Sequence, residues 1–122
     1  MGLAEKRRKY VEELEESVKR LREILASLPE VERVILFGSY ARGRRDLLTD
    51  LDVLVVMRTH LPFLERQKFL YQRLALSVDA DILCYTPEEF EALKDSPFWR
   101  TALREGVLLY EKKPTGRGEE VA

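Results

Sequence analysis

Two short polar segments, each joined to an apolar run, most constrain what this chain can fold into. The run Val34-Ile35-Leu36-Phe37 leads into Gly38-Ser39, and after ten further residues Asp50-Leu51-Asp52 opens a second apolar run. Glycine lacks a Cβ, so the backbone N–H groups of such a turn can face an anion, and Ser39 adds a hydroxyl donor. Asp50 and Asp52 project from one face of the expected strand, where they can share a hard divalent cation. The two segments therefore predict a phosphate-binding turn beside a metal site.

Apolar periodicity and turn residues predict the elements around these segments. Three- and four-residue spacing indicates helices, whereas continuous apolar runs indicate central strands. The expected elements are a long helix at 3–28, strands at 31–37, 51–57, 78–85 and 107–110, helices at 40–45 and 62–76, and two helices that start at 86 and 96. This alternation predicts an α/β (α+β) fold with a single domain at 1–111. Residues 112–122, charged and almost without apolar side chains, are predicted to form a disordered tail.

Composition narrows the functional classes. The net charge is −1 with 35% charged residues, so the basic bias of a dedicated nucleic-acid binder is absent and nucleic acid is not favoured as a substrate. The one cysteine, Cys84, cannot build a disulfide framework or a cysteine-based zinc site. No apolar run approaches the roughly 18–20 residues of a membrane span, and no signal-peptide pattern opens the chain. We therefore expect a cytoplasmic protein without a membrane partner.

The spacing of the two segments resembles a known family. Gly38-Ser39, ten intervening residues and Asp50-Leu51-Asp52, together with Ala41-Arg42-Gly43, are similar to the signature of the minimal nucleotidyltransferases (MNT) of the DNA polymerase β superfamily. The resemblance extends from about residue 31 to 110 and implies a nucleotidyltransferase-like fold, a small mixed β-sheet flanked by helices. It also implies an enzyme that binds a nucleoside triphosphate, here ATP, with two Mg²⁺ ions.

The resemblance implies a third carboxylate on a neighbouring strand. In that family the acid precedes a short apolar run, so Asp81, followed by Ile82-Leu83, matches better, while Asp79 stays open as the alternative. The implied catalytic and metal-binding residues are Asp50, Asp52 and Asp81. The implied nucleotide-binding residues are Gly38, Ser39 and Arg42.

The acceptor of the nucleotide is the harder question. The chain resembles the antitoxins of HEPN–MNT toxin–antitoxin pairs, which implies transfer of AMP to a tyrosine of a partner HEPN ribonuclease toxin. Two alternatives stay open: nucleotidyl transfer to a small molecule such as an aminoglycoside, and a non-catalytic module that binds a partner. The sequence leaves the oligomeric state undecided, and a homo-oligomer is compatible with it.

Several polar residues receive no function from the sequence. The basic cluster at 6–9 reads as the solvated face of a helix, and His60 as an inert loop residue. Arg44 and Arg45 are expected on the surface, and no role is assigned to Asp46. In the helix expected at 62–76, the residues predicted to face inward are Phe63, Leu70, Tyr71 and Leu74.

Overall fold

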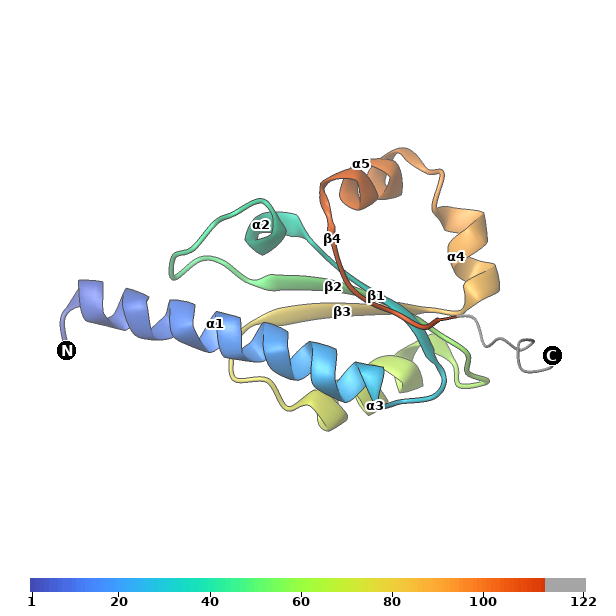
Figure 1. Ribbon diagram of the computed structural model, residues 1–122, viewed down its shortest axis with the longest axis horizontal. Helices are drawn as coiled ribbons and strands as arrows, with labels where there is room; N and C mark the ends of the chain where they lie inside the picture. Colours follow the sequence, from blue (N-terminus) through green and yellow to red (C-terminus); the bar gives the residue numbers. More distant parts are fainter. Residues whose placement is uncertain (114–122) are drawn as a thin grey trace.

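A four-stranded β-sheet lies between two layers of helices and carries both polar segments at one end (Figure 1). The computed structural model describes residues 1–113, so most of the tail expected at 112–122 lies outside the described residues. The elements in chain order are α1 (Leu3–Ala26), β1 (Val31–Phe37), α2 (Gly38–Ala41), β2 (Leu51–Met57), α3 (Phe63–Leu74), β3 (Ala80–Tyr85), α4 (Pro87–Leu93), α5 (Pro97–Glu105) and β4 (Val107–Glu111). This mixed architecture confirms the fold class predicted from the sequence.

The strand order β3-β2-β1-β4 explains why segments far apart in the sequence meet. β1 runs antiparallel to β2 and β4, whereas β2 and β3 are parallel. The end of β1 and the starts of β2 and β3 therefore lie at the same end of the sheet. Phe37 pairs with Asp52, and Asp52 pairs with Asp81. Since directly paired residues point to the same face, these three side chains form a row across three strands.

Each face of the sheet has its own hydrophobic cluster. On one face, α1 and α3 bury leucines such as Leu14, Leu21 and Leu70, each fully buried, and each contributing about 1.5–3 kcal/mol of transfer free energy. On the other face, α4 and α5 cover Leu54 and Val56 on β2 through Phe90 and Trp99, among others. Figure 1 shows α1 and α3 on one side of the sheet and α4 and α5 on the other. The row that includes Asp52 belongs to the face under α4 and α5.

The first and third helices differ from the sequence expectation. α1 ends at Ala26, two residues before the expected end at Leu28, because Pro29 disfavours helical geometry in the residue before it. In α3, Phe63 and Tyr71 are 37% and 40% exposed, so the prediction that both face the core was wrong. The buried polar residue of this helix is instead Arg66.

Arg66 is buried because its guanidinium group finds enough acceptors. It donates hydrogen bonds to both carboxylate oxygens of Glu89, at 2.7 and 3.1 Å, and to the backbone oxygens of Leu61 at 2.7 Å and Cys84 at 3.3 Å. Glu89 also closes the capping box of α4 with Thr86, at the helix start expected from the sequence. The buried ion pair thus ties α3 to the start of α4.

The short helix after β1 also lies elsewhere than expected. α2 spans Gly38–Ala41, directly after the strand, whereas the sequence suggested 40–45. Gly38 adopts a φ of +80°, which lets the chain turn from strand to helix without an intervening loop, and Gly43, at φ +102°, ends the turn. The first turn of α2 therefore begins within the Gly-Ser segment itself.

Candidate active site

The turn at Gly38 lies against the carboxylate of Asp52. A Cβ atom on residue 38 would meet Asp52 Oδ2 at 2.0 Å, far inside van der Waals contact. Only glycine fits this position, because of both the positive φ and the missing side chain. The two segments that the sequence singled out are thus in direct contact.

Asp52 is flanked by two other carboxylates. Asp81 is its partner in the parallel β2–β3 pair, and Asp50 lies two residues earlier, just before β2. Burial raises the pKa of the Asp52 carboxyl, and the negative charges of Asp50 and Asp81 raise it further, while Arg42 lowers it. Asp52 therefore has two other negative charges near it at this end of the sheet, and a cation would offset their repulsion.

The alternative acid, Asp79, lies in a different setting. It precedes β3, and its backbone oxygen accepts a hydrogen bond from Leu51 N at 3.0 Å. Burial raises the pKa of the Tyr10 hydroxyl on α1, and the charges of Asp79 and Asp50 add to this increase. Asp79 thus precedes β3, whereas Asp81 lies within β3 and is in register with Asp52.

Two of the expected nucleotide-binding residues lie beside this acid group. The hydroxyl oxygen of Ser39 is buried and has no hydrogen-bond partner among the described residues. Arg42 is exposed, and its guanidinium lies 3.8 Å from a carboxylate oxygen of Glu105 at the end of α5. A buried hydroxyl without a partner is energetically unfavourable, and this one lies in α2 directly after Gly38.

The loop between α2 and β2 is held by Asp46, to which the sequence assigned no role. Asp46 Oδ1 accepts hydrogen bonds from Leu48 N at 2.9 Å and Thr49 Oγ1 at 3.1 Å, and its carboxylate pairs with Arg44 at 2.9 Å. The hydroxyl of Tyr10 donates to the backbone oxygen of Thr49 at 2.9 Å, so α1 fixes the residue directly before Asp50. An aspartate three residues before a threonine in a loop is a recognisable turn pattern, but the role of Tyr10 depends on a contact across 39 positions that no local pattern predicts.

Tyr71 is a second positioning residue that sequence reasoning missed. Its hydroxyl donates to the backbone oxygen of Ala80 and accepts from the backbone N–H of Ile82, both at 2.9 Å. These two backbone groups flank Asp81 on the outer strand of the sheet. Tyr71 thereby fixes the segment that carries Asp81.

Comparisons with known proteins decide the family. The model of the family described as "Nucleotidyltransferase domain" matches residues 18–78. A protein of Methanocaldococcus jannaschii that carries the name protein adenylyltransferase is 36% identical over 73 residues, which cover 58% of this chain and 74% of that protein. The chain belongs to the nucleotidyltransferase-domain family. The family resemblance seen in the sequence is thereby confirmed, and the protein is a transferase with a nucleotide substrate.

Solved structures agree with this nucleotidyltransferase in fold. A nucleotidyltransferase of Sulfolobus solfataricus superposes with a TM-score of 0.56 at 23% identity, covering 84% of this chain and 86% of that one. A chain from the complex of tri-AMPylated Shewanella oneidensis HEPN toxin with MNT antitoxin gives 0.53 at 21% identity, covering 81% and 73%. At these identities the likeness shows the shared fold.

The donor set of the nucleotidyltransferase fits a divalent cation in its chemistry. Carboxylate oxygens are the ligands that Mg²⁺ prefers, and a cation would relieve the mutual repulsion of Asp50, Asp52 and Asp81. As the side chains stand within residues 1–113, no three acidic, histidine or cysteine groups converge closely enough to form a complete metal-binding cluster. Besides burial, the charges of Asp50 and Asp81 both raise the pKa of Asp52.

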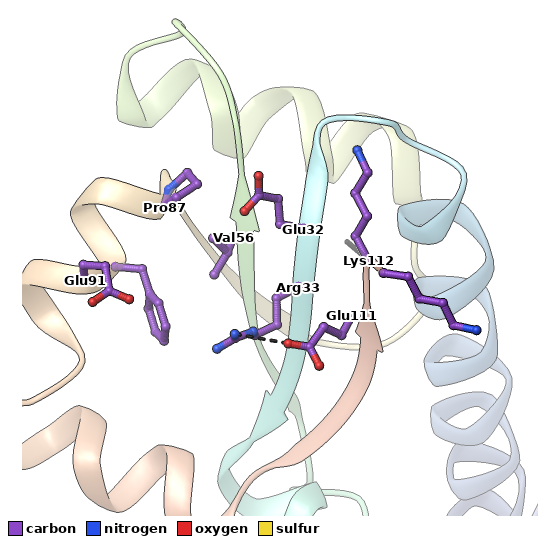
Figure 2. Close-up of a pocket in the computed structure, with 9 residues that line it drawn as sticks. Glu32, Arg33, Val56, Pro87, Glu91, Glu111 and Lys112 are labelled. Atoms are coloured by element: carbon purple, nitrogen blue, oxygen red, sulfur yellow. Dashed lines mark hydrogen bonds and ion pairs between the residues drawn. The ribbon is translucent and has the colours of Figure 1, made fainter. Parts of the chain in front are cut away.

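A separate pocket of about 720 Å³ lies at the opposite end of the sheet (Figure 2). Val56, Pro87 and Phe90 contribute its apolar part, and the ion pair between Arg33 and Glu111, at 3.2 Å, crosses its wall. None of the six residues named from the sequence lines it. The carboxylates of Asp50, Asp52 and Asp81 instead lie at the end of the sheet where β1 ends and β2 and β3 begin.

None of the helices within residues 1–113 has the length and apolar character needed to cross a bilayer.

Proposed function

We propose that this nucleotidyltransferase transfers AMP from ATP to a tyrosine hydroxyl of a HEPN-type toxin and thereby acts as its antitoxin. The observation that carries the chemical half is the register that sets Asp52 beside Asp81 with the Gly38 turn against Asp52. The M. jannaschii relative named protein adenylyltransferase supports a protein acceptor. The fold shared with a chain of the HEPN–MNT complex supports the class of partner.

In the proposed reaction the residues around Gly38 hold the triphosphate. The backbone N–H groups of the turn and the unpartnered hydroxyl of Ser39 donate to phosphate oxygens, and Arg42 adds positive charge at the rim. Bound by the carboxylates, two Mg²⁺ ions would neutralise the triphosphate and lower the pKa of the acceptor hydroxyl. Asp50 and Asp52 would hold them, with Asp81 as the third ligand.

Asp81 has a second proposed role, as the group that accepts the proton of the acceptor. The tyrosine oxygen forms a bond to the α-phosphorus of ATP, the bond from that phosphorus to the bridging oxygen of the β-phosphate breaks, and pyrophosphate leaves. Asp81 suits proton transfer because it is exposed on the outer strand while remaining in register with Asp52. Most of the rate enhancement comes from positioning and charge stabilisation rather than from a covalent enzyme intermediate.

The experiment combines the protein with a HEPN-type toxin, ATP and Mg²⁺, and measures the intact mass of that partner. We expect each transfer to add one AMP, and peptide mapping to place it on tyrosine. Asp52→Asn protein is the matched control and should leave the partner unmodified. An unmodified partner that is inhibited equally by wild type and Asp52→Asn would contradict catalysis and favour a binding module. Modification of a small molecule instead of the partner would contradict the protein acceptor.

A further inference from the structure

An exposed aromatic ring, that of Phe98, lies next to the row formed by Phe37, Asp52 and Asp81. Phe98, the second residue of α5, is 61% exposed, whereas its neighbour Trp99 is 6% exposed. A ligand that covered this ring would remove its apolar surface from water.

Phe98 is held in place by its neighbours. Its ring centroid lies 6.2 Å from that of Phe37, at an interplanar angle of 86°, and 5.0 Å from that of Trp99, at 82°. Both are edge-to-face geometries of favourable aromatic pairs. The Phe37 and Trp99 rings are themselves paired at 5.2 Å, so three rings support one another and leave the Phe98 side chain open to solvent.

The register of the strands defines where this ring lies relative to the chemistry. Phe37 is the direct cross-strand partner of Asp52, and such partners have Cβ atoms about 4.5–5.5 Å apart. Because the Phe98 ring packs against the Phe37 ring, the exposed ring lies on the β1 side of Asp52. Across the sheet, Asp81 lies on one side of Asp52, and Phe37 with Phe98 lies on the other.

We propose that Phe98 forms one wall of the nucleobase subsite and stacks on the base of the bound nucleoside triphosphate. This inference rests on the proposed function for the placement of the triphosphate at Gly38 and of the acceptor at Asp81. An acceptor that approaches Asp81 comes from the side of β3, so the ring on the side of β1 is left for the nucleotide. A ring at this position recognises the flat face of a base by stacking and makes no hydrogen bonds to its edge.

The chain supplies its own reporter for the test, because Trp99 is its only tryptophan and its ring contacts Phe98. Tryptophan fluorescence and calorimetry would follow binding of a non-hydrolysable ATP analogue, and separately of tripolyphosphate, which has no base, to the full chain with Mg²⁺. We expect the analogue to change Trp99 fluorescence more than tripolyphosphate does. Phe98→Ala should weaken analogue binding by roughly tenfold while leaving tripolyphosphate affinity unchanged.

Two matched variants separate stacking from general effects. Phe98→Tyr keeps a ring and should retain wild-type affinity for the analogue. Leu64→Ala, which truncates a 75% exposed side chain on α3, should change the affinity for neither the analogue nor tripolyphosphate. Equal analogue affinity in wild type and Phe98→Ala would overturn the inference, as would an equal loss for analogue and tripolyphosphate. If Phe98→Ala binds the analogue normally but no longer modifies a protein acceptor, the ring contacts the acceptor and the base assignment is wrong. If wild type binds the analogue through Phe98 yet modifies no protein, the proposed acceptor fails while this inference stands.

Discussion

Gly38 and Asp52 share a space that admits no additional atom. A Cβ on residue 38 would lie 2.0 Å from Asp52 Oδ2 and 2.9 Å from its carboxyl carbon, although the two residues are 14 positions apart in the chain. The contact joins the turn that is proposed to hold phosphate to the carboxylate that is proposed to hold metal. Several consequences of this arrangement can be measured.

Gly38→Ala should impair the enzyme more than a change at the other glycine with positive φ. At both positions, alanine pays about 1–2 kcal/mol for a left-handed backbone. Gly43 has no atom within 4 Å of an added Cβ, so Gly43→Ala carries that backbone cost alone, whereas Gly38→Ala must also displace Asp52. Denaturant unfolding and nucleotide titration of the two variants isolate the contact. Equal nucleotide affinity in both variants would show that the Asp52 contact does not matter for binding.

Asp52→Asn should stabilise the protein free of metal and nucleotide while it removes turnover. Burial and the charges of Asp50 and Asp81 disfavour the carboxylate, so a neutral amide relieves repulsion in the folded state. Asp46→Asn is the opposite case, because the hydrogen bond from Arg44 lowers the pKa of Asp46 and stabilises its charged form. Thermal unfolding at neutral pH should therefore move upward for Asp52→Asn and downward for Asp46→Asn. A lower melting temperature for Asp52→Asn would mean that other groups in the wild-type protein already offset the burial and repulsion of the Asp52 carboxylate.

Asp81→Ala should lower the transfer rate far more than Asp79→Ala, with similar nucleotide binding in both. Asp81 is the register partner of Asp52, whereas Asp79 precedes β3 and the paired residues of that register. Single-turnover kinetics with saturating ATP compare the two directly, and circular dichroism checks that both fold. Normal turnover in Asp81→Ala with a damaged Asp79→Ala would reverse the assignment of the third carboxylate.

The ion pair between Arg66 and Glu89 should make the free energy of unfolding decrease as the pH falls into the acid range. The hydrogen bond from Arg66 holds the pKa of Glu89 below its usual value, so this carboxylate contributes stability above the unfolded pKa near 4.5. That contribution is lost as pH falls through the lower pKa of the folded state. Glu89→Gln should cost about 1–2 kcal/mol at pH 7, a modest value because Glu89 is 43% exposed, and should flatten the acid dependence. Glu91→Gln, which alters a 68% exposed side chain, is the control and should leave the curve unchanged.

The elements with continuous or periodic apolar residues could be predicted from the sequence, because burial alone determines them. β1 and β2 occur at the expected residues, and Gly38 and Asp52 were recognised from spacing. The start of α2 was missed because it depends on the φ of one glycine, which periodicity does not report. The end of α3 was near the expected residue. The residues of α3 that face inward were not predicted correctly, because Arg66 is buried by acceptors contributed from outside its own helix.

The supporting residues of the candidate site could not be predicted for a related reason. Tyr10 and Tyr71 each read as an apolar position in a helix, yet their hydroxyl groups bond to backbone atoms of a loop and of an edge strand. Such contacts depend on how helices lie on the sheet, and strand order is not encoded in local pattern. The residue types proposed for chemistry were visible in the sequence, whereas the residues that position them required the fold.

The central claim is that the bond between the α- and β-phosphates of ATP is broken and that the nucleotide is transferred. The most direct measurement incubates the protein, Mg²⁺ and a HEPN-type toxin with ATP radiolabelled either at the α-phosphate or at the γ-phosphate. The α-label should appear in the HEPN protein, the γ-label should leave entirely as pyrophosphate, and Asp52→Asn should transfer neither. Appearance of the γ-label in the acceptor, or equal α-labelling by wild type and Asp52→Asn, would contradict nucleotidyl transfer at this acid group.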